Sequence, residues 1–232
     1  MTHVYDHVAN EYDNTFSDNL SLAEDQYIVK LFKPYIDDVL RAGGKILDIG
    51  SGTGWLLDHF NIPSYRYEGI DVSDKMVETA LLKYPNYSFK VADMREPEPW
   101  CFGGATLIAS MWTVSNYDAP LPHLLSIARN LRYGGTALLI VHTPAFYKDK
   151  RRAAGAALPT YCYDFEGWRP WESADLVEAI TEANLNAKII PFRHYNALPE
   201  WMPKWLHYFW LRRNKVAYND ALFVAIVLRK GK

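Results

Sequence analysis

Three glycines at alternate positions, Gly50, Gly52 and Gly54, follow an apolar run and precede a segment with helical spacing. Glycine lets the backbone approach a ligand closely, so this loop is a candidate binding site, although the pattern also fits a tight turn. It is neither the G-x-G-x-x-G dinucleotide fingerprint nor a P-loop, which needs Lys and Ser or Thr where Trp55 follows the last glycine. Asp48 precedes the loop, and its carboxylate favours a ligand with a cationic end over an anionic pyrophosphate.

The residues around the glycines resemble three motifs of the class I S-adenosylmethionine (SAM)-dependent methyltransferases. The stretch LDIGSGTG (47–54) is similar to their first motif, GIDVSDKMVETA (69–80) to the second and VADM (91–94) to the third. The lead YDHVANEYD (5–13) also matches a pattern common in members that act on small substrates. The resemblance covers residues 5–143 and implies that SAM is the cofactor.

The resemblance also implies a role for each matching residue. Asp71, at the end of a predicted strand, is expected to accept hydrogen bonds from the ribose hydroxyls, and Asp93 from the adenine amine beside Met94. Asp48 is expected to orient the loop or the amino group of the methionine moiety, under a lid that carries two tyrosines. Taken alone, Asp71 also fits a capping turn and Asp93 an ordinary loop acid. The full predicted cofactor set is Tyr5, Tyr12, Asp48, Gly50, Gly52, Asp71, Met76, Asp93, Met94 and Met111.

A methyl group on a sulfonium is already a strong electrophile, so the enzyme mainly aligns the acceptor atom and, for some acceptors, removes its proton. His142 is the first candidate for a general base, because it lies near the end of a predicted strand and titrates in the useful range. It also fits a packed strand residue. His194 and Tyr161 rank lower as bases, and Trp112 is expected to form a pocket wall.

Several acceptor classes are disfavoured. The segment after residues 105–112 contains neither an Asn/Asp-Pro-Pro-aromatic motif nor a Pro-Cys pair, which argues against the usual DNA amine and pyrimidine C5 methyltransferases. A net charge of −2 also argues against a protein that coats nucleic acid, so no duplex partner is expected. Cys101 and Cys162 match no metal or redox spacing.

The elements that must position these residues alternate between strands and helices. Predicted strands cover residues 46–49, 65–73, 87–94, 105–112, 136–143, 188–192 and 221–228. Predicted helices include one with Ser21 as N-cap that Pro34 interrupts and one with Ser73 as N-cap that runs to about Tyr84. Two more are predicted within 118–135, closed by Gly134 and Gly135, and over 173–183. The alternation and the resemblance together predict a doubly wound α/β fold. It has a mostly parallel seven-stranded sheet, helices on both faces and a C-terminal antiparallel strand.

The 232 residues suit one methyltransferase domain over residues 1–232. Within it we expect an N-terminal lid and helix at 1–42 and substrate-side insertions at 144–171 and 195–219. The polar start and the lack of a long apolar run predict no secretory signal, no transmembrane segment and a cytoplasmic location.

The stretch 201–215 combines five aromatic with four basic residues and contains no acid. It fits a helix that packs on the sheet, a cap over a planar acceptor, or a helix that contacts a membrane surface or a partner. The sequence therefore predicts a SAM-dependent methyltransferase that acts on oxygen or nitrogen of a small organic acceptor. The alternatives are a macromolecular acceptor (RNA, nucleobase or protein) and a SAM-binding partner protein without catalysis.

Overall fold

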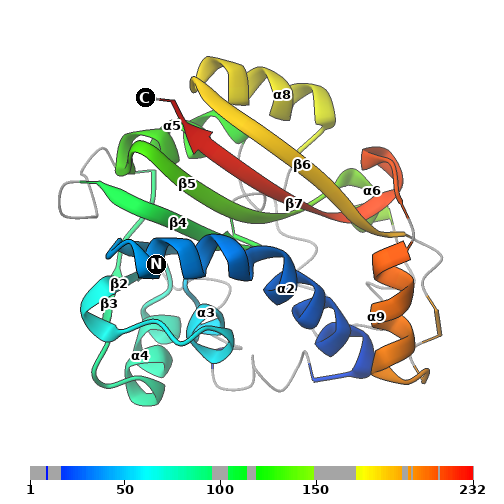
Figure 1. Ribbon diagram of the computed structural model, residues 1–232, viewed down its shortest axis with the longest axis horizontal. Coiled ribbons are helices and arrows are strands. Elements are labelled where there is room, and N and C mark those ends of the chain that lie inside the picture. Colours follow the sequence, from blue (N-terminus) through cyan, green and yellow to red (C-terminus); the bar gives the residue numbers. More distant parts are fainter. Residues whose placement is uncertain are drawn as a thin grey trace.

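The computed structural model describes residues 9, 17–95, 104–113, 119–148, 171–194, 198–199, 201–213 and 215–231. Seven strands form one sheet in the order β3-β2-β1-β4-β5-β7-β6 (Figure 1). They are β1 (Ile46–Ile49), β2 (Tyr67–Asp71), β3 (Ser88–Val91), β4 (Ala105–Met111), β5 (Leu131–His142), β6 (Leu185–His194) and β7 (Ala221–Lys230). Strands β1 to β5 pair in parallel, whereas β7 is antiparallel to both β5 and β6. The predicted fold class is confirmed.

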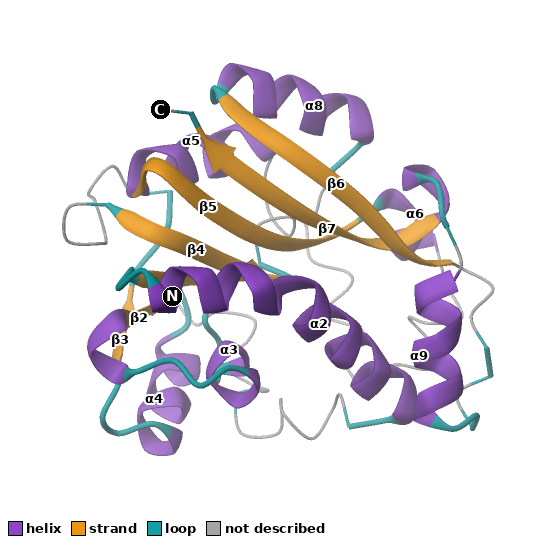
Figure 2. Ribbon diagram, viewed as in Figure 1, coloured by secondary structure: helices purple, strands orange, loops and turns teal. Residues whose placement is uncertain are grey.

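Helices lie on both faces of this sheet (Figure 2). They are α2 (Asn19–Arg41), α3 (Trp55–His59), α4 (Asp74–Lys83), α5 (Pro120–Asn130), α6 (Pro144–Lys148), α8 (Ser173–Glu182) and α9 (Lys204–Arg213), with short 3-10 turns at Ser64–Arg66 and Tyr218–Asp220. None of the helices in the described parts of the chain combines the length and the apolar composition that crossing a bilayer requires.

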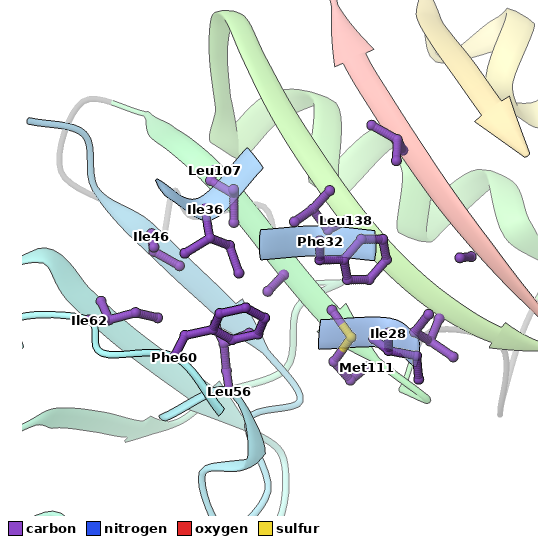
Figure 3. Close-up of a cluster of buried hydrophobic side chains, with 14 of the residues drawn as sticks. Ile28, Phe32, Ile36, Ile46, Leu56, Phe60, Ile62, Leu107, Met111 and Leu138 are labelled. Carbon is purple, nitrogen blue, oxygen red and sulfur yellow. The ribbon is translucent and has the colours of Figure 1, made fainter. Parts of the chain in front are cut away.

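Two apolar cores hold the helices to the sheet. One packs α5 and α8 against one face, and the other packs α2, α3 and α4 against the opposite face. Figure 3 shows how Phe32 and Ile36 of α2 meet Leu107 of β4 and Leu138 of β5. These side chains are fully buried, so the long α2 is fixed across the middle of the sheet by removal of apolar surface from water.

The start of α2 corrects one prediction. Asp18, not Ser21, is the N-cap, and its Oδ1 accepts hydrogen bonds from the backbone N–H of Leu20 at 2.9 Å and of Ser21 at 3.0 Å. A carboxylate satisfies two of the free N–H groups at once, which places the helix start three residues earlier. Pro34 does not shorten the helix, which runs to Arg41 because its apolar face is held by the core.

The pair Gly134 and Gly135 does not close a helix, contrary to prediction. Helix α5 ends at Asn130, and β5 begins at Leu131, which pairs with Ala105 before the register shifts. Gly134 has φ +74°, and a Cβ on Gly135 would lie 2.8 Å from the Leu131 side chain. The glycines therefore form an irregularity within β5 instead of a helix C-cap.

Candidate functional site

The glycine loop lies where the sheet order reverses. Strand β1 pairs with β2 on one side and with β4 on the other, so the loops after β1 and β4 leave in opposite directions. In open α/β sheets, ligands bind at this edge, beyond the carboxyl ends of the strands. Thr113, just after β4, contacts the loop, and its hydroxyl donates to the Gly50 carbonyl at 3.3 Å.

The three glycines have different physical reasons for lacking a side chain. All three have positive φ, at +67°, +52° and +102°. A Cβ on Gly50 would lie 2.1 Å from Thr113 Oγ1, and one on Gly54 would lie 2.6 Å from the Tyr84 ring. At Gly52 no atom of the residues that the structure describes lies within 4 Å of that position. Gly50 and Gly54 are therefore needed for packing, whereas Gly52 presents bare backbone to open space that a cofactor can fill.

Asp71 joins this loop to the next one. Its Oδ2 accepts the N–H of Gly52 and its Oδ1 accepts the N–H of Ser73, each at 2.9 Å. Ser73 in turn caps α4, as predicted, by accepting the N–H of Met76 at 3.2 Å. The Asp71 carboxylate is only half-buried, and a carboxylate oxygen can accept more than one hydrogen bond. A ribose that lies against Gly52 would meet it.

Asp48 is buried below the loop, on the side of β1 that faces α2. The hydroxyl of Tyr67, on the neighbouring strand, donates to Asp48 Oδ2 at 2.9 Å. Burial raises the pKa of Asp48 to about 7; the bond from Tyr67 opposes this shift and the nearby charge of Asp71 adds to it. Burial, followed by the charge of Asp48, also raises the pKa of Tyr67. The backbone N–H groups of Gly50 and Ser51, which donate to the Ile70 carbonyl, tie the loop to β2. Both expected roles of Asp48, orienting the loop and contacting a methionine amino group, stay predictions.

Asp93 has a partner that sequence reasoning missed. The side-chain Nε of Arg95 lies 2.9 and 3.0 Å from the two Asp93 carboxylate oxygens. The backbone N–H of Arg95 also donates to Asp93 Oδ1, at 2.9 Å. The hydrogen bond from the Arg95 side chain is the main reason that the pKa of Asp93 is lowered. An adenine amine would share this carboxylate with the guanidinium.

The remaining predicted cofactor residues are only partly placed. The side chains of Met76, Met94 and Met111 are buried in the protein interior, and Met94 Sδ lies 3.2 Å from His123 Nδ1. Their contacts with the cofactor stay predictions. Tyr5, Tyr12 and Tyr161 lie outside the described residues, as does the side chain of His194.

Aromatic side chains gather at the same edge, beside the glycine loop. Buried Phe146, Phe192 and Phe223 form a floor, with the Phe223 centroid 5.4 Å from that of Phe146 and 5.7 Å from that of Phe192. The half-buried rings of His142 and Trp112 lie on this floor, at 5.3 and 6.5 Å from Phe223. We call these five residues the aromatic floor cluster.

Trp112 connects the aromatic floor cluster to the glycine loop. Its ring meets that of Trp55, the first residue of α3, edge-on at 5.5 Å. Trp112 has φ +56°, a left-handed conformation that is uncommon for a bulky residue. Such strain persists only where the surroundings enforce it, and it concentrates at functional sites. Ring contacts thus run from Trp55 beside the glycine loop, through Trp112 and Phe223, to His142 at the carboxyl end of β5. We call this series of contacts the ring path.

A carboxyl and an imidazole border this path, and neither was predicted. Trp55 Nε1 donates to Asp25 Oδ1 at 3.0 Å, and His59 Nε2 lies 3.8 Å from Asp25 Oδ2. His59 Nδ1 lies 2.9 Å from the Trp55 carbonyl; because a carbonyl only accepts, this nitrogen carries hydrogen. Burial raises the pKa of Asp25 to about 6, against the lowering effect of His59. A carboxyl that titrates near neutrality beside a cofactor loop is a candidate acid–base group.

A seven-stranded sheet of this order, with a glycine loop after β1 and an acid at the end of β2, defines the class I SAM-dependent methyltransferases, whose cofactor is SAM. The family model of the methyltransferase domain matches residues 22–188. The chain belongs to this methyltransferase family.

Curated relatives and solved structures agree with this assignment. Demethylmenaquinone methyltransferases of Chlorobaculum parvum and Chlorobaculum tepidum are each 30% identical over 143 residues, 60% of this chain and 58% of theirs. The matched chain thus spans less than two thirds of the length of these relatives.

Two solved structures share the fold. One is a SAM-dependent methyltransferase of Thermotoga maritima, described as a possible histamine N-methyltransferase, with TM-score 0.63 at 18% identity over 98% of both chains. The other is the plantazolicin methyltransferase in complex with a desmethylPZN analog and SAH, with TM-score 0.62 at 14% identity over 97% of this chain and 90% of that one.

Proposed function

We propose that this protein transfers the methyl group of SAM to an oxygen or nitrogen atom of a small, planar or apolar organic acceptor. The observation that carries this proposal is the aromatic floor cluster, which adjoins the glycine loop at the carboxyl edge of the sheet. Rings with half-buried faces offer stacking area to a planar molecule at little entropic cost. A macromolecular duplex would need a broad basic footprint, which a chain of net charge −2 does not favour.

In this proposal the chain holds the cofactor with residues from three loops. The bare backbone of Gly52 lies against it, the Asp71 carboxylate accepts from the ribose hydroxyls, and Asp93 accepts from the adenine amine. When bound, SAM supplies an electrophilic methyl group. The N–H groups of Gly50 and Ser51 donate to the Ile70 carbonyl at 2.8 and 3.0 Å, which holds the start of the loop against β2. Asp48, bonded to Tyr67, is proposed to orient the loop or the amino group of the methionine moiety.

The acceptor is proposed to lie over the aromatic floor cluster. Trp112 forms the wall between acceptor and cofactor, and its enforced backbone conformation fixes the ring in that position. Residues 1–42, 144–171 and 195–219 are proposed to complete the acceptor side. The names of the similar proteins, which refer to a demethylated quinone, histamine and plantazolicin, agree with a non-duplex acceptor but concern those proteins. The two distant cysteines fit a reducing compartment such as the cytoplasm.

His142 is proposed as the group that takes a proton from the acceptor atom. Its ring packs between Phe146, at 4.3 Å, and Phe223, at 5.3 Å, which fixes its orientation at the end of β5. The second candidate is the Asp25–His59 pair, favoured by the raised pKa of its carboxyl. His142 lies at one end of the ring path and the Asp25–His59 pair at the other, so a substitution of one candidate leaves the other in place.

Methyl-labelled SAM, incubated with the purified chain and a fractionated cell extract, tests the proposal. We expect label in the small-molecule fraction, and at least about fivefold less when Asp71→Ala protein is used at SAM concentrations below the wild-type Kd. Label in RNA or protein would overturn the small-acceptor proposal. Tight SAM binding without transfer to any fraction would favour a binding protein without catalysis.

A further inference from the structure

We propose that the outward face of α9, together with Trp201 just before it, docks on the surface of an anionic lipid bilayer. Trp201, Trp205 and Phe209 are 78%, 68% and 48% exposed. Trp205 and Phe209 are four residues apart and lie on one face of the helix, and Trp201 lies in the turn just before the helix begins. We call these three residues the aromatic stripe. Exposed apolar side chains scattered singly need no explanation, but a contiguous row of large aromatics marks an interaction surface.

The opposite face of α9 explains why the stripe points outward. His207 and Leu211, also four residues apart, are buried. The helix packs against α2, where Lys30 Nζ lies 5.9 Å from the Tyr208 ring, and Figure 1 shows α9 beside the end of α2 that begins at Asn19. The helix is thus anchored through one side, and the aromatic stripe is the side left to solvent.

The charges around the stripe select the partner. Arg212, Arg213 and Lys215 are exposed, and residues 201–215 include no Asp or Glu, although the whole chain has a net charge of −2. The Arg213 guanidinium lies 4.3 Å from the Phe209 ring centroid. A cation beside an exposed ring matches the headgroup region of a bilayer, where aromatic side chains enter the interface and Lys or Arg meets lipid phosphates.

Other occupants fit this surface less well. A second copy of the chain, docked through the same face, would bring two clusters of Arg212, Arg213 and Lys215 together, and like charges repel. In the described parts of the chain, the other exposed aromatics with a cation over the ring are Tyr65, with Arg66, and Tyr133, with Lys230, which come from other parts of the sequence. Each of these tyrosines stands without the four-residue repeat of the stripe.

Vesicle flotation of the full chain tests the proposal. The probes are vesicles of phosphatidylcholine alone and of phosphatidylcholine with 30% phosphatidylglycerol, a mixture we choose as a strongly anionic surface. We expect binding to the anionic vesicles, weaker binding as salt increases, and at least tenfold weaker binding by the double variant Trp205→Ala, Phe209→Ala. The matched control, Tyr65→Ala, Tyr133→Ala, removes two exposed aromatics elsewhere and should bind as the wild type does.

A second variant keeps the test decisive. Arg212→Gln, Arg213→Gln retains the aromatic stripe, so we expect it to lose the preference for anionic over neutral vesicles even if the aromatic variant is poorly folded. The proposal is overturned if wild-type protein does not float with anionic vesicles, or if both α9 variants float as it does. Gel filtration that shows a dimer broken by the α9 variants, without vesicle binding, would instead assign the stripe to a contact between copies.

Discussion

Replacement of Asp71 by alanine should weaken SAM binding by an amount that the geometry bounds. The carboxylate already accepts two backbone N–H groups at 2.9 Å, from Gly52 and Ser73, and in the proposed complex it also accepts from the ribose hydroxyls. A hydrogen bond to a charged group contributes about 1.5–3 kcal/mol. In the variant, water can reach this half-buried position and replace part of the hydrogen bonding that the ribose hydroxyls lose. We therefore expect a loss of about 1–3 kcal/mol, or roughly 5- to 150-fold in Kd.

Isothermal titration of SAM into wild-type, Asp71→Ala, Asp71→Asn and Asp74→Ala protein measures this loss. Asp74 is exposed in the first turn of α4, so its variant removes the same charge nearby without touching the loop. Loss of the Gly52 anchor could also weaken binding. A 2′-deoxy analogue of SAH separates the two effects: if Asp71 binds the ribose, removal of the hydroxyl should cost much less in Asp71→Ala than in wild type.

Two results would refute this reasoning. SAM affinity within twofold of wild type in Asp71→Ala would mean that the ribose lies elsewhere. Fully additive losses from the variant and the deoxy analogue would mean that Asp71 acts only through the loop.

Three further predictions concern the loop, its support and the base. Gly52→Ala should weaken SAM binding by more than about tenfold, because its methyl group would occupy the space proposed for the cofactor. The thermal midpoint should fall by only a few degrees, because the left-handed φ costs an alanine about 1–2 kcal/mol. Normal binding would show that Gly52 does not touch the cofactor. Burial raises the pKa of Asp48 from 3.8 to about 7, so the folded protein retains a proton that the unfolded chain releases. The free energy of unfolding, measured by urea denaturation, should then fall between pH 4 and 7 and level off above, and Asp48→Asn should flatten this fall. His142→Gln should lower kcat about 100-fold with unchanged SAM affinity; a change below threefold would point to Asp25, for which Asp25→Asn is the corresponding test.

Local sequence signals predicted the fold well where burial and periodicity agree. The apolar runs at residues 105–111 and 221–228 are continuous because both faces of these central strands are covered, and they were placed correctly. The errors fall where two signals compete. Ser21 matches a capping box, but Asp18 makes the capping bonds; Gly134 and Gly135 suit a helix end, but they serve an irregular strand start. Only the neighbours in space decide such cases.

Part of the candidate site was predictable and part was not. Gly52 and Asp71 stand in two successive motifs, and the structure brings them into direct contact, because the Gly52 N–H donates to the Asp71 carboxylate. Tyr67 beneath Asp48 was missed because its side chain reaches across from a neighbouring strand. Asp25 was missed because it meets Trp55 from a helix 30 residues earlier, and nothing in its local sequence distinguishes it from a surface acid.

The outward direction of the aromatic stripe was also open. Its helical spacing was recognisable, but either face of a helix with Trp, Tyr, Phe and Leu around it could have met the protein. The structure buries His207 and Leu211 and leaves Trp201 and Trp205 exposed. Amphipathicity read from side-chain type alone would have given the opposite orientation, since histidine is more polar than tryptophan.

A crystal structure of the chain with bound SAH tests the central claim most directly. It shows in one experiment where the cofactor binds and toward which side chains its sulfur points. We expect the ribose hydroxyls within hydrogen-bond distance of Asp71, the cofactor against the Gly52 backbone, and the SAH sulfur directed toward Trp112 and the rest of the aromatic floor cluster. SAH bound elsewhere, or bound at the glycine loop with its sulfur directed away from Trp112, would contradict it.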